Sequence, residues 1–274
     1  LKSFSKNSSV IIYSDFLKIN FSKLLKDIDV IVHLISKQHE LNFFRRNYSD
    51  YYQINVKYTQ KLVKEAKKNK ITKIIYLSTI KVYGEYSSHN EIFTEHSKTN
   101  PQSYYGKTKL LSEKIIKAEL ENSKTKYSII RIPLVYGRNS KGNIKLLSKY
   151  INTRLPIFFN YKYNKRSLIN VINLSEFIAL VLKNNNSDNK LLLISDNNYY
   201  STNDIICGLI KKNKKNNLTI YFGLFTLIKI LNIIFRIRLL NNLYSNFTCS
   251  NQFAKDLMNW NPKYVFSDYI SNKS

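Results

Sequence analysis

The sequence predicts an α/β protein whose core is a doubly wound parallel sheet. Three short runs are almost wholly apolar, as strands covered on both faces should be. These runs occupy 29–36, 73–78 and 127–132. A helical pattern over 49–69 separates the first two. The second run ends in Ser78 and Thr79, and open α/β sheets place their ligands at the carboxyl ends of the strands.

Length and composition indicate a globular protein and argue against a nucleic-acid-binding one. A chain of 274 residues suffices for one large domain or two modest ones, and 43% hydrophobic residues is ordinary for a globular protein. The net charge is +26, but the lysines are spread along the chain, and Lys, Asn, Ile and Tyr are enriched together, as in AT-rich coding sequence. Because no recognised nucleic-acid module is visible, we expect no nucleic-acid partner.

The cysteines and the chain start indicate a cytoplasmic protein. Cys207 and Cys249 lie far apart without metal-ligand spacing, so we expect no metal site and reduced thiols. No signal peptide opens the sequence. The chain begins at Leu1 rather than Met, which indicates a fragment or an unusual start.

The elements before residue 80 follow the strand and helix alternation. A short strand is expected over 9–15 and a short helix over 21–27. In the strand over 29–36, His33 is expected to be structural. The helix over 49–69 contains Asn55, for which an ordinary polar helix face is the simpler interpretation.

The stretch 101–114 organises the rest of the chain. Pro101 and Ser103 suit the start of a helix, and residues four apart on that helix share a face. Tyr105 and Lys109 are therefore expected to point at the same small volume. A phenol has an ordinary pKa of about 10, which a nearby cation lowers, so that the pair becomes usable for proton transfer. The alternative is a surface helix that happens to carry a Tyr and a Lys.

Downstream, the pattern continues with more mixed elements. We expect helices after Gly142, over 174–183 and after a Ser201–Asp204 cap, and a strand over 190–195. Residues 218–235 are nearly continuous apolar sequence, interrupted by Lys229. A buried or membrane-surface helix is preferred to a spanning one. Peripheral membrane contact through 218–238 is an alternative, with Lys229, Arg236 and Arg238 meeting anionic lipid.

Three motifs in order resemble the extended short-chain dehydrogenase/reductase family. They are Ser78-Thr-x-x-Val-Tyr-Gly84, Pro101-x-Ser-x-Tyr-x-x-x-Lys109 and Arg131-Ile-Pro-x-Val-Tyr-Gly137. More narrowly, the chain resembles nucleotide-sugar epimerases and 4-keto reductases of the UDP-glucose 4-epimerase type. Finer features resemble members from bacterial surface-polysaccharide pathways: Ile80–Glu85, Lys141-Gly-Asn143, Asn164–Ser167 and Leu257-x-x-Trp-x-Pro262.

The resemblance implies a Rossmann-like domain and a smaller mixed α/β substrate domain. The dinucleotide-binding part would be 1–137 with 167–195 returning to it, and the nucleotide-sugar part 138–166 with 196–274. The implied reaction is epimerisation at C4 of a UDP-hexose. The runner-up is 4-reduction of a UDP-4-keto-6-deoxy-hexose, towards which Lys81 and Asn164–Ser167 lean. A homodimer is a further expectation, because family members are often dimers.

The resemblance also implies site residues, carried over by motif. The implied catalytic residues are Tyr105, Lys109, Thr79 and Ser78, with Lys109 lowering the pKa of Tyr105. The implied contacts to NAD or NADP are Asp15, Leu34, Ile35, Ser36, Tyr105, Lys109 and Pro133. The implied contacts to the UDP-sugar are Thr79, Lys81, Asn143, Ile144 and Arg166, with Pro156–Phe159 around the nucleobase. A loop-initiating or capping role explains Asp15 nearly as well.

One family feature is missing. The family begins with a strand, a Gly-x-x-Gly-x-x-Gly turn and a helix, which let the backbone approach the cofactor diphosphate. None of the 6 glycines precedes Gly84. We therefore expect the chain to lack the first βα unit and to bind cofactor weakly on its own. A non-catalytic remnant or nucleotide-sugar binding module is the corresponding alternative.

Overall fold

In the computed structural model, the described residues are 19–38, 47–88, 90–138, 143–153, 161–213 and 244–271. Their strands are β1 Val30–His33, β2 Lys73–Thr79, β3 Lys126–Ile132, β4 Leu134–Tyr136, β5 Arg166–Asn170, β6 Lys190–Leu193 and β7 Tyr199–Tyr200. Their α-helices are α1 Phe21–Leu24, α2 Tyr48–Tyr51, α3 Tyr58–Lys68, α4 Tyr104–Leu120, α5 Asn143–Ile151, α6 Val171–Lys183, α7 Thr202–Lys212, α10 Gln252–Met258 and α11 Phe266–Ile270.

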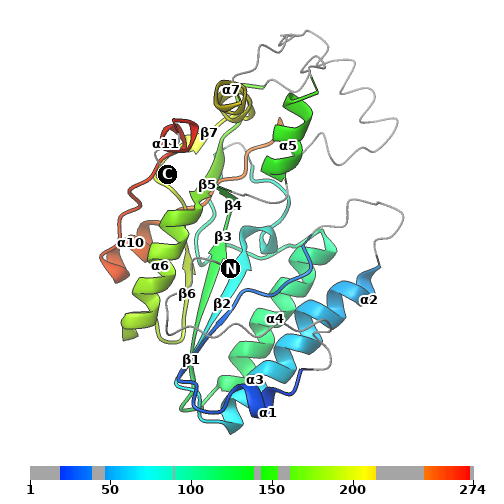
Figure 1. The fold of residues 1–274 in the computed structure, drawn as a ribbon, viewed down its shortest axis with the longest axis vertical. Helices are drawn as coiled ribbons and strands as arrows, with labels where there is room; N and C mark the ends of the chain where they lie inside the picture. Colours follow the sequence, from blue (N-terminus) through cyan, green and yellow to red (C-terminus); the bar gives the residue numbers. More distant parts are fainter. Residues whose placement is uncertain are drawn as a thin grey trace.

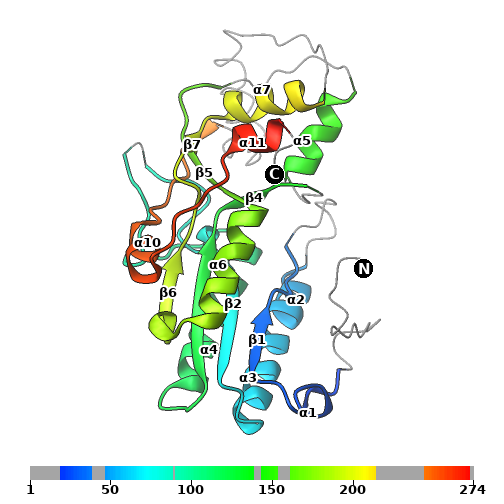
Figure 2. The same ribbon diagram turned by 60° about the vertical axis from the view of Figure 1, so that its left-hand side comes forward.

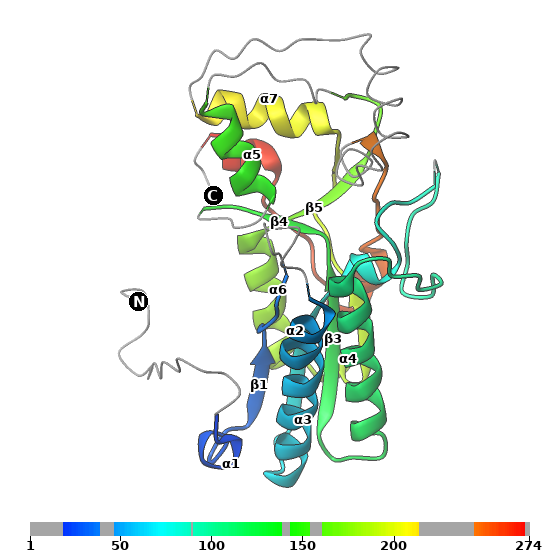
Figure 3. The ribbon, with the colours of Figure 1, turned by 90° about the vertical axis from the view of Figure 1, so that its right-hand side faces the viewer.

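The larger sheet is parallel and covered on both faces, which confirms the predicted fold class. Its strand order is β1-β2-β3-β6, with every neighbouring pair parallel. Helices α3 and α4 cover one face and α6 covers the other (Figure 3). Alternate residues of β2 face the two layers: Ile74 and Tyr76 pack with α3 and α4, whereas Ile75 packs with α6.

A smaller mixed sheet follows at the carboxyl end of the larger one (Figure 1). Its order is β4-β5-β7, with β4 and β5 parallel and β5 and β7 antiparallel. Helices α5, α7 and α11 share a core with it. Helix α10 instead packs against the α6 face of the larger sheet through Ala254 and Met258. The predicted domain boundaries stay a prediction.

Strand β1 lies at one edge of the larger sheet as the described residues form it (Figure 2). Its residues Val30, Ile31 and Val32 are half-buried, whereas the matching β2 residues Ile74 and Ile75 are fully buried. Strand β1 ends at His33, so the expected strand over 29–36 is shorter, and 34–38 form a loop after it.

The helix expected over 49–69 is present but not uniform. Helix α2 passes into a π-helical segment, Tyr52–Lys57, before α3 begins. The expected helix over 174–183 begins earlier, at Val171, because the Asn170 side chain accepts a hydrogen bond from the amide of Ile172. The Ser201–Asp204 cap of α7 is confirmed as a reciprocal capping box.

Several expectations concern residues outside the described ranges. They are the strand over 9–15 with Asp15, the segment Pro156–Phe159 and the apolar stretch 218–238. Within the described ranges, none of the helices has the length and apolar character that a membrane crossing requires.

Candidate active site

The carboxyl end of β2 presents the first polar group. Thr79 closes the strand in an extended conformation and caps a 3₁₀ turn, Ile80–Val82, its Oγ1 accepting a hydrogen bond from the Lys81 amide at 3.3 Å. Parallel strands open their ligand sites at this end of a sheet. The Thr79 hydroxyl therefore lies where the sequence places a substrate oxygen.

Helix α4 brings Tyr105 to this strand end. Ser103 caps the helix by accepting a hydrogen bond from the Gly106 amide at 3.3 Å. A Cβ atom on Gly106 would lie 2.6 Å from the Lys81 carbonyl oxygen, so only glycine lets the first turn approach the 3₁₀ turn this closely. Ser36, Thr79 and Gln38 lie close enough to the Tyr105 hydroxyl to lower its pKa.

Burial, rather than Lys109, dominates the pKa of Tyr105 in this structure, and the expected lowering of that pKa by Lys109 stays a prediction. Desolvation raises the pKa of Tyr105 to about 12, and hydrogen bonding from Ser36, Thr79 and Gln38 opposes that rise only in part. Lys109 is not among the groups that lower this pKa. The half-buried phenol is therefore protonated at neutral pH when no ligand is present.

Lys109 is buried one helical turn below Tyr105. Its Nζ lies 3.9 Å from the centroid of the Tyr76 ring, so a cation–π contact holds the ammonium against β2. Burial lowers the pKa of Lys109 to about 7, while the Glu113 carboxylate opposes the shift. The spacing of four residues correctly placed Tyr105 and Lys109 on one face of the helix. The contact with Tyr76, however, directs the Lys109 amine towards β2.

Asn55 fixes the loop that follows β1, although an ordinary polar helix face was the simpler interpretation of the sequence. Its Oδ1 accepts a hydrogen bond from the Lys37 amide at 2.8 Å, and its Nδ2 donates to the Lys37 carbonyl at 3.1 Å and to Thr108 Oγ1 at 2.9 Å. One buried amide thus ties the Ser36 loop to α4 next to Lys109. The sequence did offer one indication, because Asn55 resembles a family position where Asn steadies the wall of the active site.

The π-helical segment supports Asn55. Segments of this kind often mark functional sites because they redirect backbone groups. The Asn55 carbonyl accepts hydrogen bonds from Thr59 Oγ1 at 2.6 Å and from Ser112 Oγ at 2.7 Å. Thr59 also pairs with His33 Nε2 at 2.8 Å. Burial and the nearby Lys109 lower the pKa of His33 to about 3, so this histidine is neutral, and its place is structural, as expected.

The Ser78 hydroxyl is bound to a different partner from Thr79, and its expected catalytic role stays a prediction. Its hydroxyl donates a hydrogen bond of 2.5 Å to Glu113 Oε1 on α4. Neighbouring residues of a strand point to opposite faces, so Ser78 turns towards α4 inside the sheet packing. Glu113 is also paired with Arg131 of β3.

The expected substrate residues are distributed over three elements. Lys81 Nζ lies 2.7 Å from Glu85 Oε2, in an ion pair beside Thr79. Arg166 opens β5, donates a hydrogen bond to the Ser245 carbonyl at 3.2 Å and lies above the Phe247 ring. Desolvation lowers the pKa of Arg166 to about 10, and Glu85 opposes this change, so Glu85 links the two cations electrostatically.

The remaining expected residues have different environments. Asn143 begins α5, and its expected contact with the substrate diphosphate stays a prediction. Ile144 is only 2% exposed and packs in the core of the smaller sheet, and its expected substrate contact stays a prediction. Pro133 is buried between β3 and β4, Ile35 packs against the core, and Leu34 is 55% exposed on the loop after β1.

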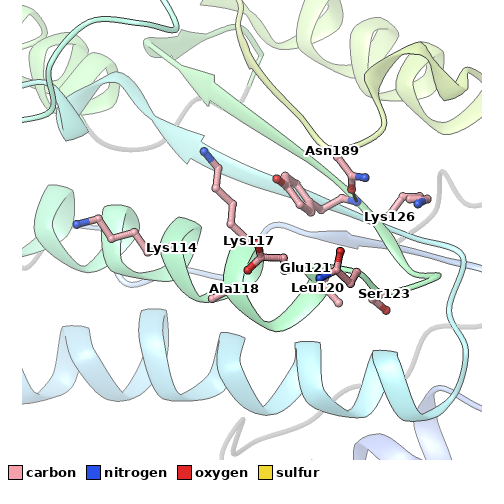
Figure 4. A pocket seen from close by; sticks show the side chains of 10 residues that line it. Lys114, Lys117, Ala118, Leu120, Glu121, Ser123, Lys126 and Asn189 are labelled. Atoms are coloured by element: carbon pink, nitrogen blue, oxygen red, sulfur yellow. Dashed lines mark hydrogen bonds between the residues drawn. The ribbon is translucent and has the colours of Figure 1, made fainter.

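A surface hollow of about 600 Å³ lies at the opposite end of the sheet (Figure 4). Residues from the end of α4 and the start of β3 line it, including Lys117, Glu121 and Lys126. Because this is the amino end of the strand, the hollow is separate from Tyr105 and Thr79. Among the residues that the structure describes, no group of His, Cys, Asp and Glu is arranged to hold a metal ion.

The amino-acid sequence of this chain is similar to a known protein family and to characterised enzymes. The profile of a family described as the NAD dependent epimerase/dehydratase family matches residues 4–194. The chain is 30% identical over 162 residues to UDP-glucose 4-epimerase of Vibrio cholerae, covering 58% of this chain and 49% of that protein. It is 32% identical over 136 residues to N-acetyl-alpha-D-glucosaminyl-diphospho-ditrans,octacis-undecaprenol 4-epimerase of Escherichia coli O157:H7, covering 49% of this chain and 40% of that protein. The matches thus span about half, or less, of these relatives.

Solved structures share the fold. UDP-glucuronic acid 4-epimerase from Bacillus cereus in complex with NAD has a TM-score of 0.76 at 24% identity, over 94% of this chain and 77% of that one. DesIV, a dTDP-glucose 4,6-dehydratase from Streptomyces venezuelae with NAD and TYD bound, has a TM-score of 0.73 at 19% identity, over 92% of this chain and 74% of that one. At these identities the likeness concerns the fold.

Proposed function

Because the chain belongs to the NAD dependent epimerase/dehydratase family, we propose that it serves NAD-dependent epimerisation at C4 of a UDP-hexose. The observation that carries this proposal is the meeting of Tyr105 and Thr79 at the carboxyl end of β2, with Lys109 one turn below. A phenol and a hydroxyl side by side can hold one sugar oxygen and move its proton. The two 4-epimerase relatives support the same reaction class.

The described residues fit the nicotinamide side of a cofactor site. The loop 34–38 is pinned by Asn55 beside Tyr105, and Pro133 ends the neighbouring strand β3. Ser36, Tyr105, Lys109 and Pro133 would hold the cofactor there. NAD, when bound, supplies the acceptor and donor of hydride. None of the 6 glycines precedes Gly84, so no glycine-rich turn for the diphosphate stands ahead of β1 in this sequence.

Tyr105 is the proposed proton acceptor for the 4-hydroxyl of the sugar. Thr79 would hold that oxygen throughout the transfer, and the ketone formed at C4 would turn before its reduction from the other face. The raised pKa of Tyr105, about 12, means that accepting the proton requires a cation close to the phenol oxygen. Lys109 is the cation in the adjacent turn, and movement of its Nζ away from the Tyr76 ring would stabilise the phenolate.

Substrate binding is proposed to use the positive groups above the site. Arg166 and Lys81, with the helix start at Asn143, would contact the UDP diphosphate, since guanidinium groups and helix amino ends favour phosphate oxygens. The undecaprenol-linked substrate named for the Escherichia coli relative supports a role in surface-polysaccharide supply. A homodimer and a cytoplasmic location stay predictions.

The experiment is a turnover assay on the longest in-frame coding sequence that contains these 274 residues. UDP-galactose is supplied with NAD and no reductant, and formation of UDP-glucose is followed. An epimerase turns over under these conditions, whereas the alternative 4-reductase of a UDP-4-keto-6-deoxy-hexose requires added NADH or NADPH. UDP-sugar binding without turnover under either condition would favour the non-catalytic binding module and contradict the proposal.

Tyr105→Phe gives the first site-directed prediction. Removing the hydroxyl takes away the proton acceptor, so kcat should fall by a factor of about 10² to 10⁴, with little change in KM. Tyr104→Phe is the matched control, because Tyr104 is the preceding residue and is 42% exposed. Full activity of Tyr105→Phe would remove Tyr105 from the mechanism.

A further inference from the structure

We propose that Glu113 is a positioning residue that locks α4, β2 and β3 in register beneath the site. This inference rests on the proposed function for its kinetic consequences. Its structural basis is independent of the substrate, because it concerns contacts among buried side chains of the described residues.

Both oxygens of the Glu113 carboxylate are occupied. Oε1 accepts hydrogen bonds from Ser78 Oγ at 2.5 Å and from Arg131 Nε at 3.0 Å, while Oε2 accepts from Arg131 Nη2 at 2.6 Å. The exposed fractions of Ser78 and Glu113 are 1%, and that of Arg131 is 4%. A bidentate Arg–carboxylate pair is geometrically specific, so the three side chains fix one arrangement of their elements.

Each partner of Glu113 lies within two residues, along the chain, of a proposed site residue. Ser78 precedes Thr79, Arg131 lies two residues before Pro133, and Ser78 and Arg131 are paired in the β2–β3 register. Glu113 itself lies on the same helix as Tyr105, two turns further on. A shift of α4 along the sheet would break the ion pair, so the pair fixes where Tyr105 meets Thr79.

The ion pair extends to the segment after β2. The Arg131 guanidinium carbon lies 4.7 Å from the centroid of the Tyr83 ring, and that ring stacks on Phe93 at 4.8 Å. A buried ion pair contributes little to stability compared with well-packed apolar residues, because desolvation offsets most of the attraction. Positioning of the three elements is therefore a better explanation for this ion pair than stability is.

The second consequence concerns Lys109. The Tyr76 ring of β2 lies against its ammonium, and His33 on β1 and Glu113 on α4 interact with it electrostatically. His33 is neutral, and the Tyr76 ring offers only a partial charge. Among these described groups, Glu113 favours the charged form of Lys109, whereas burial disfavours it. Without the Glu113 charge, Lys109 should lose its proton at a lower pH.

The test is Glu113→Gln in the longest in-frame coding sequence, read out by lysine ¹³Cε NMR and by the pH profile of kcat. The Lys109 resonance is assigned by its loss in Lys109→Met. The midpoint of the Lys109 titration should fall by about one pH unit or more, because a nearby opposite charge shifts a pKa by about 1–3. The kcat value should fall about 10-fold or more, with KM nearly unchanged.

Three further variants keep the outcome decisive. Glu119→Gln, on the same helix in a surface pair with Lys64, should leave both readouts unchanged. Glu113→Asp retains the charge and should restore the Lys109 midpoint more than kcat. Should Glu113→Gln fail to fold, Ser78→Ala decides: it removes one bond to Glu113 and should lower kcat without moving the Lys109 midpoint.

An unchanged Lys109 midpoint and pH profile in folded Glu113→Gln would overturn the charge part of the inference. Wild-type kcat in Ser78→Ala would overturn the positioning part. The proposed function fails separately: a wild-type protein without turnover contradicts the epimerase proposal, while the NMR titration still tests the charge part.

Discussion

At the scale of single residues, the site depends on one amide that binds three partners. Asn55 accepts from the Lys37 amide and donates to the Lys37 carbonyl and to Thr108, so it connects the loop after β1 with α4. Substitution of a buried hydrogen-bonding group leaves its former partners unsatisfied, which is more costly than the bonds themselves contribute. The loop that carries Ser36 is therefore expected to be sensitive to this side chain.

Asn55→Ala should lower the free energy of unfolding by about 1–3 kcal/mol and loosen the loop 34–38. The direct measurement is hydrogen exchange of the Lys37 amide, which should become faster because its acceptor is gone. Gln53→Ala, an exposed change in the same π-helical segment, is the matched control. Unchanged exchange at Lys37 would show that Asn55 does not hold the loop.

The residues also show how far the sequence could predict the site. Tyr105 and Lys109 were predictable as a pair because helical spacing is local, and Thr79 because a buried strand ends there. The direction of the Lys109 amine was not, because it depends on Tyr76, a residue of another element that the spacing does not reveal. The same applies to Ser78, whose partner Glu113 becomes visible only when α4 packs on β2.

At the scale of elements, the approach of α4 to the end of β2 decides the geometry of the site. Gly106 follows Tyr105 directly, and a Cβ atom added to it would meet the Lys81 carbonyl oxygen and the Pro101 side chain. The alternation of strands and helices was readable from the sequence because each pattern is periodic. The π-helical segment Tyr52–Lys57 was not, because its apolar spacing is nearly that of an ordinary helix.

Gly106→Ala separates helix propensity from close packing. Helix propensity alone predicts that the free energy of unfolding rises by about 1 kcal/mol, since alanine stabilises a helix relative to glycine. The added Cβ would lie 2.6 Å from a backbone oxygen, so α4 must move, and overpacking of this kind typically costs about 1–3 kcal/mol. We expect a net loss of stability in urea unfolding and a lower kcat, because Tyr105 moves with the helix.

Lys107→Ala is the control for this variant, since Lys107 is exposed in the same turn and alanine changes its propensity little. A gain in stability for Gly106→Ala, of the size that propensity predicts, would mean that the contact with Lys81 relaxes without strain. In that case Gly106 would not determine the position of Tyr105.

At the scale of the whole molecule, two features affect cofactor binding: the position of β1 in the larger sheet and the positions of the glycines in the sequence. Strand β1 has one paired neighbour among the described strands, and its apolar residues are half-buried. The residues proposed for the nicotinamide side are among the described ones, but the sequence before β1 holds no glycine. Backbone amides at a glycine-rich turn supply much of the affinity for a dinucleotide diphosphate, because they bind anionic oxygens directly.

The 274-residue chain alone should therefore bind NAD much more weakly than at micromolar affinity. A micromolar dissociation constant corresponds to about 8 kcal/mol of binding free energy, which the groups around Tyr105 and Lys109 are not expected to supply without a diphosphate cradle. Isothermal titration of this chain with NAD is the measurement, and UDP is the matched control ligand. Since Arg166 and Lys81 are present, UDP should still bind, and its binding would show that the chain is folded. Micromolar NAD binding would mean that other residues cradle the diphosphate, and the expected weakness would be wrong.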